Sequence, residues 1–223
     1  MKIVTILGSP HGTKGSTGRL LDPLFRAVKS RGADAVLLSL AELAVRPCCA
    51  CDTCHKTGRC AVRDDFATIR QAMLDADGLV LASPNYIFSV SAQMKCLLDR
   101  CCGPLHTIAL DGKYAAAVVT SGGSGSAEVE AYLLRFLRAM GCWTVGSVGA
   151  EAWKLANPAT AGPALEAAST LGVRLCEAIE GKVAFADQAA ERQAFYSRMK
   201  ELMILRKEEW PFEYDYWHSM GRL

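Results

Sequence analysis

Several features that define whole classes of protein are missing from this sequence of 223 residues. The formal net charge is only +2, so no excess of positive charge would attract nucleic acid. The longest uncharged stretch, residues 78–94, is interrupted by Ser-Pro-Asn at its centre and does not suit a membrane span. The apolar run at residues 3–7 is too short for the core of a secretory signal. We therefore expect a cytoplasmic protein that binds neither nucleic acid nor membrane.

Two common phosphate-binding motifs are also missing. Residues 3–7 predict a buried strand, and a loop rich in Gly, Ser and Thr follows at residues 8–18. Its spacing fits neither a Walker loop, because residue 13 is Thr, nor Gly-x-Gly-x-x-Gly. A hydroxyl-rich loop before a helix can still hold a flavin phosphate through backbone N–H groups, hydroxyls and the helix dipole. The alternative is a polar turn in which Ser16 or Thr17 caps the helix.

Strand-like and helix-like segments alternate along the chain, and 51% of the residues are hydrophobic. Predicted strands cover residues 3–7, 35–40, 78–82, 114–120 and 142–148. Predicted helices cover residues 20–28, 66–74 (capped by Asp64 or Asp65), 90–101, 129–140 and 163–179. This alternation indicates an α/β fold whose parallel sheet is covered on both faces. Five strands suit a flavodoxin-like, doubly wound sheet of order 2-1-3-4-5.

Two further loops follow predicted strands, at residues 83–89 and 120–126. They leave the carboxyl ends of the strands, which is where open α/β sheets bind ligands. Together the loops offer aromatic and amide faces and backbone groups, which suit a planar ring. The alternatives are that Tyr86 and Phe88 belong to the core and that the Gly/Ser loop is a plain connection. Three suitable loops at one sheet edge favour a ligand site.

Half of the ten cysteines lie within residues 48–60. Without Cys49, their spacing is Cys48-x2-Cys51-x2-Cys54-x5-Cys60. Three thiols on a tight loop and a fourth shortly after them can hold a [4Fe–4S] cluster. Structural zinc usually takes two cysteine pairs that lie farther apart. The spacing favours a cluster over vestigial cysteines, a zinc site or a regulatory disulfide.

The other cysteines, and the histidine in the cysteine loop, have simpler interpretations. Cys49 and His55 are expected to line the cysteine loop without binding metal. The other five cysteines lie on predicted helix or strand faces, and most are expected to be small buried hydrophobic residues: Cys96, Cys101, Cys102, Cys142 and Cys176. No side chain stands out as a catalytic acid or base.

The last residues of the chain differ from the rest. A helix is predicted over residues 187–209, and an aromatic segment follows at residues 210–217. We expect this tail to pack on its own domain or on a second subunit. The alternative is an ordinary terminal helix on its own core. The predicted domains are therefore residues 1–185, a flavodoxin-like domain, and residues 186–223, a C-terminal extension.

Several motifs, taken in order over about residues 1–180, carry a family resemblance. They are Gly8-Ser9-Pro10 with Gly15-Ser16-Thr17, the cysteine run with Asp64-Asp65, Ser83-Pro84-Asn85-Tyr86 leading to Asp99-Arg100, and Gly122-Gly123. In these motifs the chain resembles the iron–sulfur flavoproteins, in the NADPH-dependent FMN reductase branch of the flavodoxin-like superfamily. It departs from the family pattern in a phosphate loop one residue longer than usual, and in His11 where Arg is common.

The resemblance implies cofactors and residues. FMN would have its phosphate at Ser9, Ser16 and Thr17. Its ring would lie between Ser83, Pro84, Asn85, Tyr86, Ile87 and Phe88 on one side and Ser121, Gly122, Gly123 and Ser124 on the other. The [4Fe–4S] cluster would be bound by Cys48, Cys51, Cys54 and Cys60. The family also implies a homodimer or homotetramer, with the cluster of one subunit near the flavin of another.

These features predict an oxidoreductase that passes electrons between a one-electron donor such as ferredoxin and a two-electron, small-molecule acceptor. One alternative is a clusterless FMN or quinone reductase that uses NAD(P)H as its donor. A second alternative is a flavin-binding electron carrier without enzymatic activity. The cysteine spacing favours the first interpretation.

Overall fold

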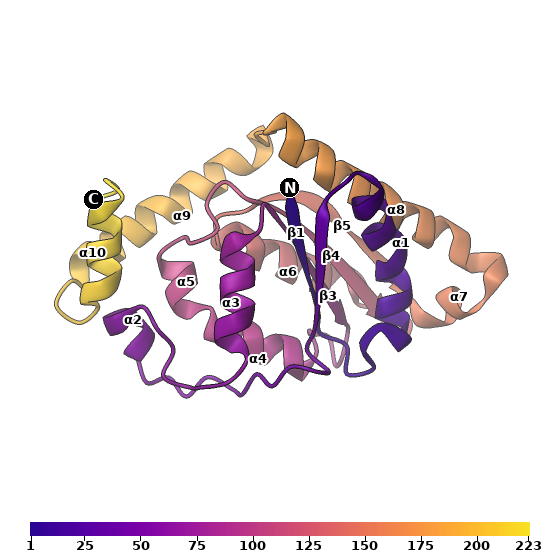
Figure 1. Ribbon diagram of the computed structural model, residues 1–223, viewed down its shortest axis with the longest axis horizontal. Helices are drawn as coiled ribbons and strands as arrows, with labels where there is room; N and C mark the ends of the chain where they lie inside the picture. The colour runs from indigo at the N-terminus through magenta and orange to yellow at the C-terminus, as the bar shows by residue number, and fades with distance from the viewer.

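A central parallel sheet organises the computed structural model, which describes all residues from 1 to 223 (Figure 1). Its strands are β1 (Lys2–Leu7), β2 (Asp34–Ser39), β3 (Gly78–Pro84), β4 (Tyr114–Ser121) and β5 (Trp143–Glu151). Every neighbouring pair is parallel and the order is β2-β1-β3-β4-β5. The predicted flavodoxin-like topology is confirmed.

Helices cover both faces of the sheet. On one face lie α1 (Ser16–Ser30) and α8 (Pro158–Gly181), and on the other lie α3 (Phe66–Asp75), α4 (Ala92–Arg100) and α6 (Ser126–Ala139). The short elements are η1 (Gly12–Lys14), α2 (Thr53–Thr57), α5 (Cys102–His106) and α7 (Ala152–Ala156). Because both faces are covered, β3 and β4 are buried along their whole length. None of the helices is long and apolar enough to cross a membrane.

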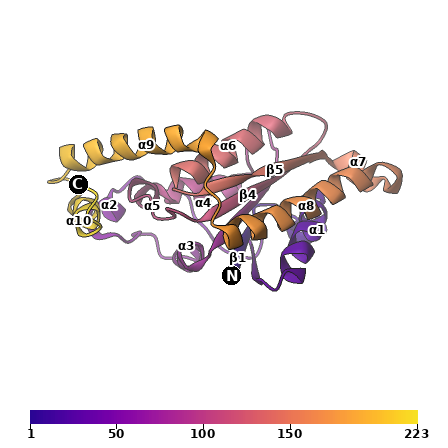
Figure 2. The same cartoon turned by 90° about the horizontal axis from the view of Figure 1, so that it is seen from above.

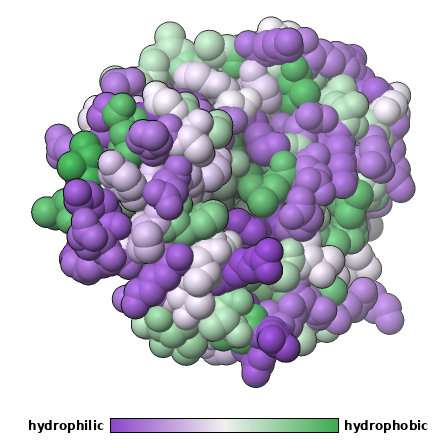
Figure 3. Space-filling view, turned by 60° about the vertical axis from the view of Figure 1, so that its left-hand side comes forward, coloured by the Kyte–Doolittle hydropathy of each residue, from purple (hydrophilic) through white to green (hydrophobic).

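The C-terminal region forms two helices. The predicted single helix over 187–209 ends earlier than expected, because α9 spans Ala186–Leu205. The aromatic segment forms α10 (Pro211–Ser219), with proline at the first helical position, where its missing N–H costs nothing. Figures 1 and 2 both show α10 beside α2, far from α1. Figure 3 turns this end of the molecule forward and shows apolar residues in small groups among polar ones.

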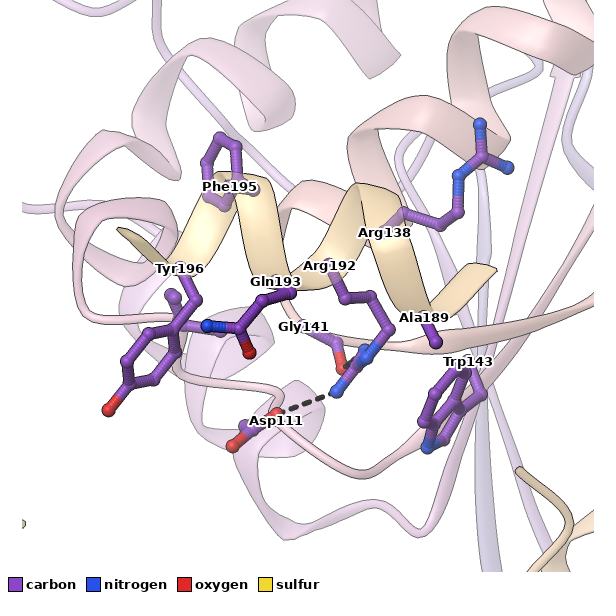
Figure 4. Close-up of a pocket in the computed structure, with 10 residues that line it drawn as sticks. Asp111, Arg138, Gly141, Trp143, Ala189, Arg192, Gln193, Phe195 and Tyr196 are labelled. Atoms are coloured by element: carbon purple, nitrogen blue, oxygen red, sulfur yellow. Dashed lines mark hydrogen bonds and ion pairs between the residues drawn. The ribbon is translucent and has the colours of Figure 1, made fainter. Parts of the chain in front are cut away.

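α9 is fastened to the edge strand β5 by two side chains. The Gln188 amide exchanges hydrogen bonds with the backbone N and O of Thr144, at 3.0 and 2.8 Å, as a further strand would. Arg192 stacks over Trp143 at 4.1 Å and pairs with Asp111 at 2.8 Å (Figure 4). The extension is therefore fastened to the start of β5, and its separation from residues 1–185 as a domain stays a prediction.

A buried ion pair closes the base of the cysteine loop, residues 44–65. Arg100 from α4 bonds both carboxylate oxygens of Asp64, at 2.8 and 3.1 Å, and both side chains are almost fully buried. The same guanidinium donates to the carbonyls of Arg46 and Val62, each at 3.0 Å. Burial alone would raise the pKa of Asp64, but hydrogen bonds from Arg100 and from two backbone amides lower it to about 2.

We predict that Asp64→Asn lowers the free energy of unfolding by about 3 kcal/mol at pH 7, because it leaves a buried guanidinium without its counter-ion. The carboxylate contributes this stability above its unfolded pKa of about 4, and the contribution fades as the pH falls toward the folded pKa of about 2. Urea titrations of both proteins from pH 7 down to pH 2 measure the difference.

Asp99→Asn is the matched control, because Asp99 forms an exposed pair with Lys95 on the same helix as Arg100. Its removal should change the free energy of unfolding by less than about 0.5 kcal/mol. Equal losses in the two variants would contradict the role given to the buried pair.

Candidate functional site

Three loops meet at the carboxyl edge of the sheet, and hydrogen bonds join them. The hydroxyls of Thr17 in α1 and Thr120 in β4 lie 2.6 Å apart, and both are buried. The backbone N of Asn85, just after β3, donates to Thr120 O at 2.6 Å. Ser91 donates its hydroxyl to the carbonyl of Gly8, just after β1. The predicted convergence of the loops is therefore present.

The first of these loops presents amides and hydroxyls at the start of α1. Gly15 is the N-cap residue and no side chain caps the helix, so the alternative in which Ser16 or Thr17 does so is wrong. Both hydroxyl residues lie in the first helical turn, whose amides have no intrahelical partners. Ser9 Oγ would lie 3.1 Å from a Cβ at Gly15, so it sits beside the same helix end. This arrangement suits a phosphate.

The loop after β3 presents apolar side chains to the outside. Tyr86, Ile87 and Phe88 are 44%, 92% and 78% exposed, so Tyr86 and Phe88 do not belong to the core of this chain. Ile87 and Phe88 both have left-handed backbone angles, with φ of 50° and 59°. Such angles are strained for bulky residues and cluster at functional sites. The loop thus holds exposed apolar side chains in place at a cost in backbone free energy.

Two buried polar atoms beside this loop have no partner. Asn85 donates to Ser124 O at 2.9 Å, but its Oδ1 atom accepts no hydrogen bond, and neither does the buried Oγ of Ser121. Unpaired buried polar atoms are costly, so these two atoms are available to hydrogen-bond a ligand. A Cβ at Gly122 or Gly123 would meet nothing within 4 Å, so the Gly/Ser loop leaves open space. An anionic ligand with a polar-edged planar ring, such as FMN, fits these residues.

The four cysteines of the predicted spacing line one cavity of about 170 Å³. Cys48 and Cys51 are exposed, and Cys54 and Cys60 are half-buried. Arg100, which closes the loop, also lines the cavity, and its buried Nε atom has no partner. Four thiols around one cavity are the donor set that a [4Fe–4S] cluster requires, and hydrogen bonds from a nearby N–H donor can tune such a cluster. Cys49, His55 and Cys102 also line this cavity.

A second group of polar residues was not expected from the sequence. Its carboxylate is Glu213 of α10, which is fully buried. Glu213 Oε1 lies 2.6 Å from His55 Nδ1, and Oε2 lies 3.0 Å from His106 Nδ1. The two imidazoles stack with centroids 4.9 Å apart, and Trp210 stacks on both of them. Cys102 Sγ lies 3.8 Å from His106 Nε2.

The charges of this group depend on one another. Hydrogen bonds from His106 and His55 lower the pKa of the Cys102 thiol. Burial opposes charge on His106, but its hydrogen bonds with Cys102 and Glu213 raise its pKa. The expectation of simple burial holds for Cys101, Cys142 and Cys176, whereas Cys102 belongs to this polar group. The sequence signal that could have revealed this polar group is the spacing of Cys102 and His106, which lie one helical turn apart.

Another cavity, of about 240 Å³, lies under α9 (Figure 4). Two arginines line it, and each is already paired. Arg192 bonds Asp111 at 2.8 Å and Arg138 bonds Glu191 at 2.7 Å. No residue predicted for the site lies there, so we place the site at the sheet edge and the cysteine loop.

Comparisons with known proteins agree with this geometry. A family model described as NADPH-dependent FMN reductase matches residues 1–154. An iron–sulfur flavoprotein of Archaeoglobus fulgidus is 32% identical over 228 residues, which cover 99% of both chains. Another, of Methanosarcina thermophila, is 29% identical and covers 81% of this chain and 96% of its own.

Among solved structures, an archaeal flavodoxin matches the fold with a TM-score of 0.54 at 16% identity, over 81% of this chain and 99% of its own. Family membership also argues against a flavin carrier without enzymatic activity. The chain therefore belongs to the iron–sulfur flavoproteins of the NADPH-dependent FMN reductase family, and it is a flavin-dependent oxidoreductase.

Proposed function

We propose that this protein passes electrons between a ferredoxin-like donor and a two-electron, small-molecule acceptor, by way of a [4Fe–4S] cluster and FMN. The observation that carries the proposal is the single cavity lined by Cys48, Cys51, Cys54 and Cys60. When bound, the cluster supplies one-electron chemistry, and FMN couples one-electron to two-electron transfer.

The chain's own residues bind and orient the FMN. Ser9, Ser16 and Thr17 hold the phosphate with hydroxyls and first-turn amides, and the helix dipole favours its charge. Asn85 Oδ1 and Ser121 Oγ offer hydrogen bonds to the polar edge of the ring. Ser83 and Pro84 are the buried last residues of β3 and position the loop beside the ring. The other residues of the two loops border the ring: Tyr86, Ile87, Phe88, Gly122, Gly123 and Ser124.

Arg100 acts on the cluster site as well as on the loop. Its guanidinium bonds the carbonyls of Arg46 and Val62, so it fixes where the loop begins and ends. Its unpaired Nε lies in the wall of the same cavity as the thiols. A cation beside thiolates stabilises the reduced, more negative state of a cluster. We therefore assign it a role in setting the potential.

The homodimer or homotetramer that the family resemblance implies stays a prediction. It is supported by the placement of the two sites in one chain. Figures 1 and 2 show α2, in the cysteine loop, at the end of the molecule away from α1, which begins the phosphate site. The exposed Ile87 and Phe88 beside the flavin site are suited to contact a second subunit.

We predict that protein purified without oxygen contains about one FMN, four irons and four acid-labile sulfides per chain. Cys51→Ala should lose the iron and keep the FMN, because Cys51 is exposed and comes just before α2, which lies at the other end of the molecule from α1 (Figure 1). Cys49→Ala, a change two residues away that leaves the proposed ligands intact, should keep both. Flavin without iron in the wild-type protein, even after anaerobic reconstitution, would refute the cluster.

A second candidate function is favoured by the description of the matching family, NADPH-dependent FMN reductase. In that case NADPH would reduce the flavin directly and the cluster would not be needed. We predict that Cys51→Ala loses flavin reduction by reduced ferredoxin but not by NADPH. Anaerobic stopped-flow absorbance of the bound flavin measures both rates. Unchanged ferredoxin-dependent reduction in the variant would favour the clusterless function.

We further predict that Ser16→Ala weakens FMN binding about tenfold, because it removes one hydrogen bond to a charged phosphate. Quenching of flavin fluorescence on titration into flavin-free protein gives the dissociation constant. Ser30→Ala, at the other end of α1, is the control and should leave binding unchanged. Equal affinity in Ser16→Ala and the wild type would place the phosphate elsewhere.

A further inference from the structure

The buried group around Glu213 brings together three potential metal ligands that the proposed function does not use. They come from two elements: His55 from α2, and Cys102 and His106 from α5. Their ligand atoms all lie within 4.8 Å of one another. Ligand atoms in a tetrahedral zinc site are about 3.5 Å apart, since each bond is about 2.0–2.3 Å. A small side-chain adjustment therefore suffices to enclose an ion.

Glu213 orients the two imidazoles for this purpose. It occupies Nδ1 of both His55 and His106, which leaves the Nε2 atom of each ring for a ligand. Histidines that bind metals usually donate their other ring N–H to a carboxylate in this way, which fixes the tautomer and the ring plane. Trp210, stacked on both rings, restricts their rotation further.

We propose that His55 Nε2, Cys102 Sγ and His106 Nε2 bind a zinc ion, with Glu213 as the carboxylate that positions both histidines. Two imidazoles and one thiolate are a donor set that zinc prefers. Asp52 Oδ1, 3.8 Å from His55 Nε2, or a water molecule completes the fourth position. Binding requires the Cys102 thiol and both Nε2 atoms to be free of protons, so the ion takes the place of any that they carry.

The site adjoins the proposed cluster site, because His55 and Cys102 line the same cavity as the four cluster cysteines. Its ligands are nevertheless different residues. Cys102 and His106 lie on α5, outside the run of residues 48–60 that supplies the four cluster cysteines. The ion would join α2 to α5 directly and α10 through Glu213, and would hold His55, the neighbour of Cys54, in place. Its role is structural: it fastens the C-terminal helix to the cysteine loop.

The test uses the purified protein with its FMN and iron, incubated with zinc chloride and then desalted. Elemental analysis should find one zinc per chain. X-ray absorption at the zinc edge, which the iron does not disturb, should show one sulfur at about 2.3 Å and nitrogen or oxygen at about 2.0 Å. Cys102→Ser and His106→Gln should each lose the zinc, and Glu213→Gln should weaken its binding about 10- to 100-fold.

Cys96→Ser is the matched control, because it changes a half-buried cysteine of α4 that lies outside the group. It should keep the zinc. FMN and iron contents report separately on the fold and on the proposed function. If Cys102→Ser fails to retain FMN, His106→Gln and Glu213→Gln decide the test.

Three outcomes would overturn the proposal. The first is a wild-type protein that retains no zinc. The second is zinc that survives Cys102→Ser and His106→Gln but is lost in Cys51→Ser, because it then occupies the cluster cysteines. The third is loss of iron in Cys102→Ser with FMN retained, because Cys102 is then a ligand of the cluster.

Discussion

The buried pair of Arg100 and Asp64 is the interaction on which the cysteine site depends. The loop it closes has little regular structure of its own apart from α2, so its ends must be held from outside. One guanidinium satisfies Asp64 and two loop carbonyls at once. Burying two charges is costly unless each is fully bonded. Removing either partner therefore leaves a buried charge unpaired and releases both ends of the loop that carries the four thiols.

The sheet imposes the second constraint. Because helices cover both of its faces, the sheet itself offers ligand-binding polar groups only in the loops at the ends of its strands. Thr17 and Thr120 link two of these loops through buried hydroxyls, so the loops are held as one unit. Unpaired atoms such as Ser121 Oγ then stand out as places for a ligand. The fixed position of the sheet and the unpaired polar atoms at its edge both follow from the burial of its two faces.

The sequence predicted what depends on local patterns. The strands, their order and the convergence of three loops follow from apolar periodicity and from the rules of parallel sheets. The cysteine spacing is likewise local. Sequence reasoning missed the early end of α9 and the helical form of the tail, although Pro211 was a signal for a helix start. It could not foresee Glu213, because this residue bonds a histidine 158 positions away, and such pairs are set by tertiary packing alone.

The C-terminal helix is consequently part of the cysteine loop's environment. Gly58 of the loop has a left-handed φ of 71°, and a Cβ there would lie 2.3 Å from the ring of Phe212. Trp217 donates its indole N–H to the carbonyl of His106 at 2.9 Å. The C-terminal helix contacts the loop at Gly58 through Phe212 and bonds His55 through Glu213. A shift of this helix would therefore move His55 and, with it, the adjacent Cys54. The surroundings of the cysteines are thus built from the loop, α5 and α10 together, which is why the loop motif alone does not describe the site.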